Sequence, residues 1–199
     1  MEAPTTELGL TDAVIVNYVK NNNDGSADLY VQQSDFFASY GIILHVENFK
    51  NNINAGDSIK GIKGVFTPFI ADDNNNVTSS KITISSKNAE LLSVVNKNNK
   101  LRTTDIDDIE YIIGWGTKNY ESTLSITPKG KIEKKDNKYY LTSKSTSIAL
   151  HGIDMSKFEG ENVAVCGVVD AGNINSGKTT IILRSESDVI ATNYSFNTI

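Results

Sequence analysis

Hydrophobic and polar residues alternate with a period of two in five segments of the first half of the chain. Such alternation, with many β-branched and aromatic residues, is typical of β-strands, whose successive side chains point to opposite faces of a sheet. Stretches rich in Asn, Asp and Gly separate the segments and predict turns, because these residues tolerate left-handed backbone. The predicted strands cover residues 13–19, 27–32, 41–46, 58–66 and 81–85.

The same pattern returns in the second half of the chain. Residues 54–59, Asn-Ala-Gly-Asp-Ser-Ile, precede the glycine-containing fourth strand of the first half, and residues 158–163, Phe-Glu-Gly-Glu-Asn-Val, hold the same place in the second. An internal duplication accounts for this correspondence. We therefore expect an all-β protein with two tandem five-stranded, barrel-like halves. The second set of predicted strands covers residues 123–132, 138–142, 147–151, 162–169 and 178–183.

Residues 103–113 lie between the halves and follow a different pattern. They begin with Thr and Asp and carry apolar residues at 106, 109, 112 and 113, a spacing that predicts a short helix ended by Gly114. The predicted organisation is a first domain with an N-terminal extension (1–99), a helical connector (100–122) and a second domain with a C-terminal tail (123–199).

Short phrases in both halves resemble an OB-fold family, the divergent OB-like domains of secreted or lipid-anchored proteins of gut bacteria. The resemblance covers most of residues 13–190. It implies two tandem OB-like five-stranded barrels, a binding or assembly role, and export from the cytoplasm. The phrases are residues 28–33 (Asp-Leu-Tyr-Val-Gln-Gln), 40–44 (Tyr-Gly-Ile-Ile-Leu), 55–64 (Ala-Gly-Asp-Ser-Ile-Lys-Gly-Ile-Lys-Gly), 137–141 (Asn-Lys-Tyr-Tyr-Leu) and 160–167 (Gly-Glu-Asn-Val-Ala-Val-Cys-Gly).

The net charge of −5 and the isoelectric point near 5.1 do not suit a protein whose whole surface binds phosphates. A local basic patch stays open, because residues 123–199 carry nine basic and eight acidic side chains. Residues 129–144 contain six lysines against two acids, an excess of four positive charges.

In an OB fold, the second and third strands and two neighbouring loops form the usual ligand face. Lysines there suit the phosphates of single-stranded nucleic acid, and one tyrosine suits stacking on a base. Alternation places Tyr139 and Tyr140 on opposite faces, so only one of them can face a ligand. A lysine-rich hairpin is also an ordinary solvated edge, and the acidic chain favours that alternative. The candidate residues are Lys131, Lys134, Lys135, Lys138, Tyr139, Tyr140 and Lys178.

Tyr111, Trp115 and Tyr120 lie around the connector and form a second candidate site. Their rings suit stacking on sugars, but packing between the two halves is the favoured interpretation. The expected function is thus a non-enzymatic ligand-binding or assembly module, with single-stranded nucleic acid as the leading ligand. The alternative is an extracellular carbohydrate- or protein-binding surface lipoprotein module.

Residues 172–179, Gly-Asn-Ile-Asn-Ser-Gly-Lys-Thr, match the pattern of a phosphate-binding P-loop. A working P-loop opens a helix, whereas the β-branched residues that follow predict a strand. We interpret the pattern as the loop before the last strand. His45 and His151 are expected to be structural, and Cys166 to be a small buried hydrophobe. No catalytic residue, cofactor or metal is therefore expected.

No apolar stretch reaches the roughly 18 residues of a membrane-spanning helix. The polar opening residues lack the features of a signal peptide and suit a mature exported protein. We expect a periplasmic or cell-surface protein, with a cytoplasmic location left open.

Overall fold

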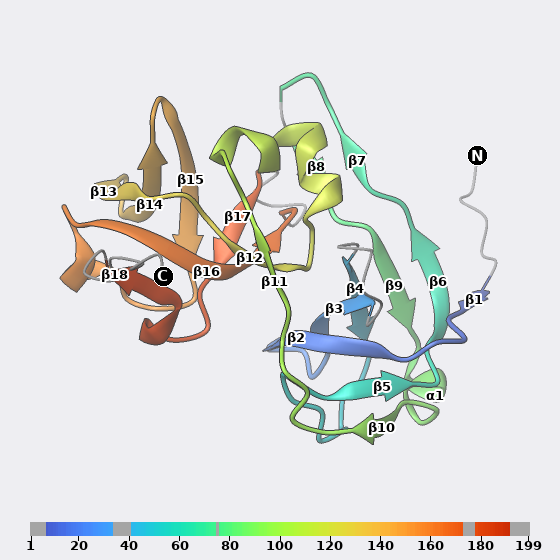
Figure 1. Cartoon of the computed structure of the whole chain (residues 1–199). Coiled ribbons are helices and arrows are strands. Elements are labelled where there is room, and N and C mark those ends of the chain that lie inside the picture. The colour runs from blue at the N-terminus through green and yellow to red at the C-terminus, as the bar shows by residue number, and fades with distance from the viewer. Residues whose placement is uncertain (1–6, 34–40, 75, 173–177, 192–199) are drawn as a thin grey trace, which may run out of the picture.

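The computed structural model describes residues 7–33, 41–74, 76–172 and 178–191. The chain is mostly β-sheet with few helical segments, and its strands form two curled multi-stranded sheets that lie side by side (Figure 1). Each of the ten segments predicted as strands overlaps a strand of the structure.

The first sheet has eight strands in the order β1-β6-β9-β4-β3-β2-β5-β10. The pair β4–β9 is parallel, and the others are antiparallel. A separate two-stranded pair, β7–β8, precedes β9. The bounds are β1 Glu7–Gly9, β2 Val14–Asn21, β3 Ala27–Gln33, β4 Gly41–Val46, β5 Ser58–Lys60, β6 Lys63–Thr67, β7 Ile70–Ala71, β8 Val77–Thr78, β9 Lys81–Ile84 and β10 Ser93–Asn96, with the short helix α1 at Ser86–Ala89.

Two predicted strands are divided in the structure: residues 123–132 into strands at 124–126 and 130–135, and residues 58–66 into β5 and β6. Gly61 lies at the break with φ +82, and a Cβ there would lie 1.9 Å from the carbonyl oxygen of Leu91. Glycine is required because the position is both left-handed and sterically closed. The break lets β5 pair with β2 while β6 pairs with β9, which curls the sheet.

The second sheet follows a closely similar order. β15 pairs with β17 in parallel, and the long strand β16 pairs with β12, β13, β17 and β18. The bounds are β11 Thr103–Asp105, β12 Leu124–Ile126, β13 Gly130–Lys135, β14 Lys138–Ser143, β15 Thr146–His151, β16 Asn162–Asp170, β17 Thr180–Ile182 and β18 Val189–Ala191.

The predicted connector helix is wrong in its first part. Residues 103–105 form β11, parallel to β12, and the N–H of Ile106 still donates to the carbonyl of Ile126. This sheet pairing overrides the local helical spacing. The helical part consists of two 3-10 segments, η1 at Ile109–Ile112 and η2 at Gly114–Asn119, while η3 (Ser156–Phe158) and η4 (Glu186–Asp188) lie in later loops.

The two sheets have separate cores and share a third. The shared cluster joins Tyr30 and Ile43 of the first sheet to Leu124, Val168 and Ile182 of the second. The sheets also meet closely elsewhere, because the Asn17 amide donates to the Ser122 carbonyl over 2.8 Å. The junction is therefore packed. The domain boundaries drawn at 99/100 and 122/123 stay a prediction.

Candidate functional site

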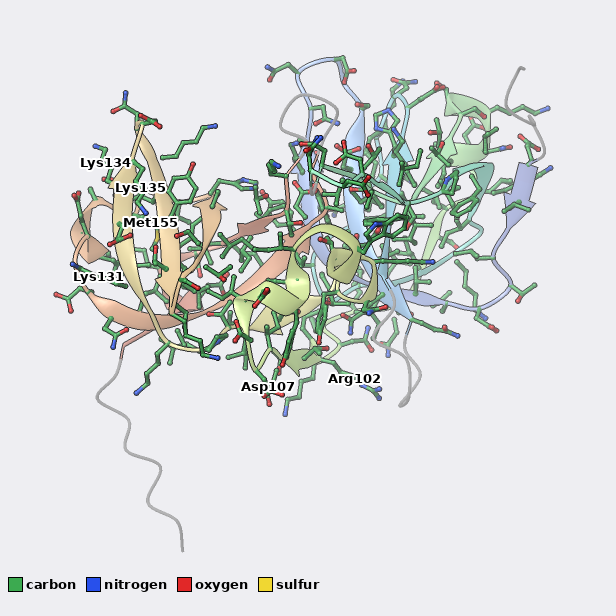
Figure 2. The ribbon with its side chains drawn as sticks, turned by 90° about the horizontal axis from the view of Figure 1, so that it is seen from above. Arg102, Asp107, Lys131, Lys134, Lys135 and Met155 are labelled. Atoms are coloured by element: carbon green, nitrogen blue, oxygen red, sulfur yellow. The ribbon has the colours of Figure 1, made fainter. Side chains whose placement is uncertain are left out.

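The lysine-rich segment forms the predicted hairpin of β13 and β14. Lys134 lies opposite Tyr139 and Lys135 opposite Lys138 in the register of this antiparallel pair. Asp136 and Asn137 make the turn with positive φ angles of 49° and 60°, which Asp and Asn tolerate. Figure 2 shows Lys131, Lys134 and Lys135 on the flank of the second sheet that faces away from the first.

The lysines of the hairpin differ in their partners. Lys135 lies 3.0 Å from the Glu133 carboxylate, so this charge is partly compensated. Lys134 Nζ lies 5.4 Å from the centre of the Tyr139 ring, within cation–π range. Lys178 lies elsewhere, since it donates over 2.5 Å to the carbonyl of Asn74 in the β7–β8 loop.

Tyr139 and Tyr140 separate as the strand pattern predicts. Tyr139 packs partly against the second core and also lines a groove of about 540 Å³. Tyr140 is half-buried and is not among the residues that line this groove. The groove brings together β14, β15 and β17 of the second sheet with β2 of the first. Its polar and aromatic lining includes Tyr18, Lys20, Asn137, Lys138, Tyr139, His151, Asp170 and Thr180.

A second cavity, of about 300 Å³, lies against β3, β4 and β9 of the first sheet. Lys20 and Asp170 line both this cavity and the groove of about 540 Å³. We call the two together the junction groove, because each is walled by both sheets. The side chains of the second cavity are Lys20, Asp28, Tyr30, Ile43, His45, Thr67, Thr78, Ser79, Lys81 and Asp170, with Gly172 completing the wall.

Both histidines lie in the junction groove, one in each cavity. His45 Nδ1 lies 2.7 Å from an Asp28 carboxylate oxygen, and His151 Nε2 lies 2.9 Å from the Thr180 hydroxyl. The sequence predicts structural roles for both histidines and does not indicate that they share one groove. No local pattern signals this, because the residues meet only through the packing of the two sheets.

Asp170 is the most buried charged group of the groove, with 8% of the residue exposed. Burial raises its pKa, while Lys20 and hydrogen bonds from the Gly172 N–H and the Tyr30 hydroxyl act in the opposite direction. Burial also raises the pKa of Tyr30, with the Asp170 charge adding to the effect. Burial lowers the pKa of His151, and the positive charge of Lys20 lowers it further.

The aromatic side chains of the connector are more exposed than expected. Tyr111 and Trp115 are 57% and 62% exposed, so the favoured interpretation that they pack the two halves together is wrong for most of their surface. Trp115 does contact Phe69, with ring centres 6.2 Å apart and planes tilted by 56°. Tyr120 is half-buried against the second core, so it does not join an exposed platform.

Glu121 is a buried acid that sequence reasoning missed. Its Oε1 accepts a 2.6 Å hydrogen bond from the Ser80 hydroxyl, and its Oε2 has no hydrogen-bond partner in the described part of the chain. Burial raises the pKa of Glu121 to about 8, although the Ser80 hydrogen bonds lower it. Its hydrogen bond to Ser80, the residue before β9, joins the first sheet to the segment that precedes β12.

The apparent P-loop lacks the helix that phosphate binding requires. Residues 173–177 lie outside the described residues, and the chain continues as strand β17 from Thr180. Within the described ranges, no group of three or more His, Cys, Asp or Glu side chains is arranged to hold a metal ion. No helix in this part of the chain is long and apolar enough to cross a membrane.

Comparisons with known proteins give no family. No protein-family model matches the sequence, and no curated protein matches it. One matching solved structure is described as "Structure of murine DNA binding protein bound with ds DNA". It is 13% identical with a TM-score of 0.36, over 96% of this chain and 99% of that chain. A likeness at this level carries no argument about function.

Proposed function

We propose that the chain is a non-enzymatic binding module made of two tandem OB-like barrels, related to the exported OB-like domains of gut bacteria. The strand pairings support the proposal. In the first sheet β2, β3, β4, β5/β6 and β9 pair in the order 1-2-3-5-4-1, and β12/β13, β14, β15, β16 and β17 do the same in the second. Both circuits contain one parallel pair, between the third and fifth strands.

The ligand proposed for this module is single-stranded nucleic acid lying across β14 and β15. These are the second and third strands of the second circuit, which form the usual ligand face of an OB fold. The observation that carries the proposal is the 540 Å³ groove, where Tyr18 and Tyr139 lie with Lys20 and Lys138. Aromatic faces that stack on bases and cations that meet phosphates are what a single strand requires.

The charge distribution fits such a ligand in spite of the acidic chain. The excess of four positive charges in residues 129–144 is local to the hairpin beside the groove. A local field of this kind attracts a polyanion even when the whole chain is acidic, and salt weakens it. We therefore expect binding that is strongest at low ionic strength.

Fluorescence anisotropy with a labelled single strand tests this ligand. Replacing Lys134 and Lys138 by Ala is expected to weaken binding about tenfold and to reduce the salt slope by roughly 0.7 for each lost phosphate contact. Lys97→Ala is the matched control, because Lys97 is exposed and lines neither cavity. An absence of binding at low salt would rule out the proposed ligand, and an unchanged salt slope would rule out this surface.

A carbohydrate is the second candidate ligand, favoured by the exposure of Tyr111 and Trp115. Exposed aromatic rings stack on the apolar faces of sugars, and an acidic chain is no obstacle to this contact. A polysaccharide array probed with the protein and with Trp115→Ala tests it. Binding lost in the variant would favour this candidate over nucleic acid.

The non-enzymatic and exported parts of the proposal have separate tests. ATP turnover by the purified chain would contradict the non-enzymatic role, and ATP binding would contradict our interpretation of residues 172–179 as a plain loop. The gene sequence upstream of the first residue tests export, because a signal ending in a lipidated cysteine is expected for a surface lipoprotein.

A further inference from the structure

We infer that the binding site for a single strand extends across both sheets, with Lys20 at the crossing between the two cavities of the junction groove. This inference rests on the proposed function and adds to it the second cavity, which lies against the first sheet. The sequence directed attention to the lysines of the second half alone. The first sheet adds Lys20, His45 and Lys81, which lie in its β2, β4 and β9.

Among the described residues of the first sheet, Lys20 is the one that lines both cavities. Strand pairing fixes its position, because it lies opposite Asp28 in the β2–β3 register. Lys20 is half-buried and lines the groove. Its aliphatic stem therefore packs against the protein, and its ammonium group faces the groove. A strand that leaves Tyr139 along the groove meets Lys20 before it reaches the second cavity.

The second cavity lies against the part of β3 and β4 that the second sheet does not cover. Tyr30 and Ile43 on these strands are buried in the shared cluster and are 2% and 7% exposed. Asp28, His45 and Lys81 still line free space of about 300 Å³. This volume is at the lower end of the range for small-ligand sites, which suits one unpaired nucleotide.

The two carboxylates of the groove are hydrogen-bonded to groups other than its lysines. Asp28 accepts hydrogen bonds from His45 at 2.7 Å and from the Asn22 amide at 3.3 Å. Asp170 accepts hydrogen bonds from Tyr30 and from the Gly172 N–H, which lower its pKa, whereas burial raises it. In the described part of the chain neither Lys20 nor Lys81 forms an ion pair within 4.0 Å, so both ammonium groups can meet phosphate oxygens. The hydroxyls of Thr67, Thr78 and Ser79 in the same cavity add hydrogen-bond partners for a sugar or a base.

Anisotropy titrations with oligothymidines of graded length test the extended site. Lys20→Met keeps the apolar stem and removes the charge. With long strands we expect its affinity to fall roughly five- to tenfold and its salt slope to fall by about 0.7. Because Lys20 lines both cavities, the shortest strands that bind should also lose affinity, whereas Lys81→Ala should weaken only strands long enough to reach the first-sheet cavity. Lys81→Ala is a second variant that removes a charge from the first-sheet cavity alone, and Lys97→Met is the control.

The outcomes separate the inference from the proposed function. If Lys20→Met and Lys81→Ala bind all lengths as the unaltered chain does, while the Lys134 and Lys138 variants bind weakly, the strand stays on the second sheet and the inference is wrong. If the unaltered chain binds no single strand at low salt, both are wrong. Binding of a neutral oligosaccharide in the groove, lost in Lys20→Met, would replace the nucleic acid by a carbohydrate. Thermal unfolding of each variant shows that the fold is retained.

Discussion

Glu121 carries a carboxyl group buried at the junction of the two sheets, with one oxygen bonded to Ser80 and the other without a hydrogen-bond partner in the described structure. Its pKa rises from an ordinary value of 4.5 to about 8, chiefly because burial penalises the charged form. Between these pH values the folded chain holds a proton that the unfolded chain has released. Stability linked to Glu121 must therefore fall as pH rises from about 5 to 8.

Glu121→Gln removes this titration and keeps the shape of the side chain. We expect the variant to be more stable than the unaltered chain at pH 8, by roughly 1–3 kcal/mol, and to lose stability less steeply across this range. Urea denaturation at several pH values measures both effects. Glu90→Gln, on an exposed residue, is the control and should leave the profile as it was. Parallel profiles for Glu121→Gln and the unaltered chain would show that Glu121 does not titrate as described.

At the scale of elements, ten segments that cover twelve strands of the structure could be predicted because each segment carries its own alternation over several residues. The strands that were missed, β1, β7, β8, β10, β11 and β18, contain only two to four residues, too few for a periodic signal. The connector illustrates a different limit. Ile106, Ile109 and Ile112 are all buried as helical spacing implies, but the N–H of Ile106 donates to the Ile126 carbonyl of β12 and not to a helical partner.

Gly61 tests the element-scale account of the break between β5 and β6. Gly61 and Gly25 both have φ +82, but a Cβ would lie 1.9 Å from the Leu91 carbonyl at Gly61 and within 4 Å of nothing at Gly25. Gly25→Ala should cost only backbone strain, about 1 kcal/mol. Gly61→Ala should cost at least about 2–3 kcal/mol, since the backbone at Leu91, between α1 and β10, must also shift. Denaturant unfolding compares them, and equal losses would contradict the steric account.

At the scale of the whole molecule, the candidate site divides into a part that sequence reveals and a part that only packing creates. The lysine hairpin shows itself as a local excess of charge, and Tyr139 follows from strand alternation. Lys20 and Asp170, by contrast, come from β2 and β16 and meet only where the sheets pack together. Their sequence neighbourhoods contain no sign of a site, so the junction groove could not be foreseen.

Photo-crosslinking of a single thymidine strand, followed by mass spectrometry of the adducts, tests the central claim most directly. The account predicts adducts on the peptides that carry Tyr18 and Tyr139, one from each sheet, because both side chains line the groove. High salt should abolish them, since phosphate contacts weaken as ionic strength rises. No adducts at low salt, or adducts confined to the peptide that carries Tyr111 and Trp115, would contradict it.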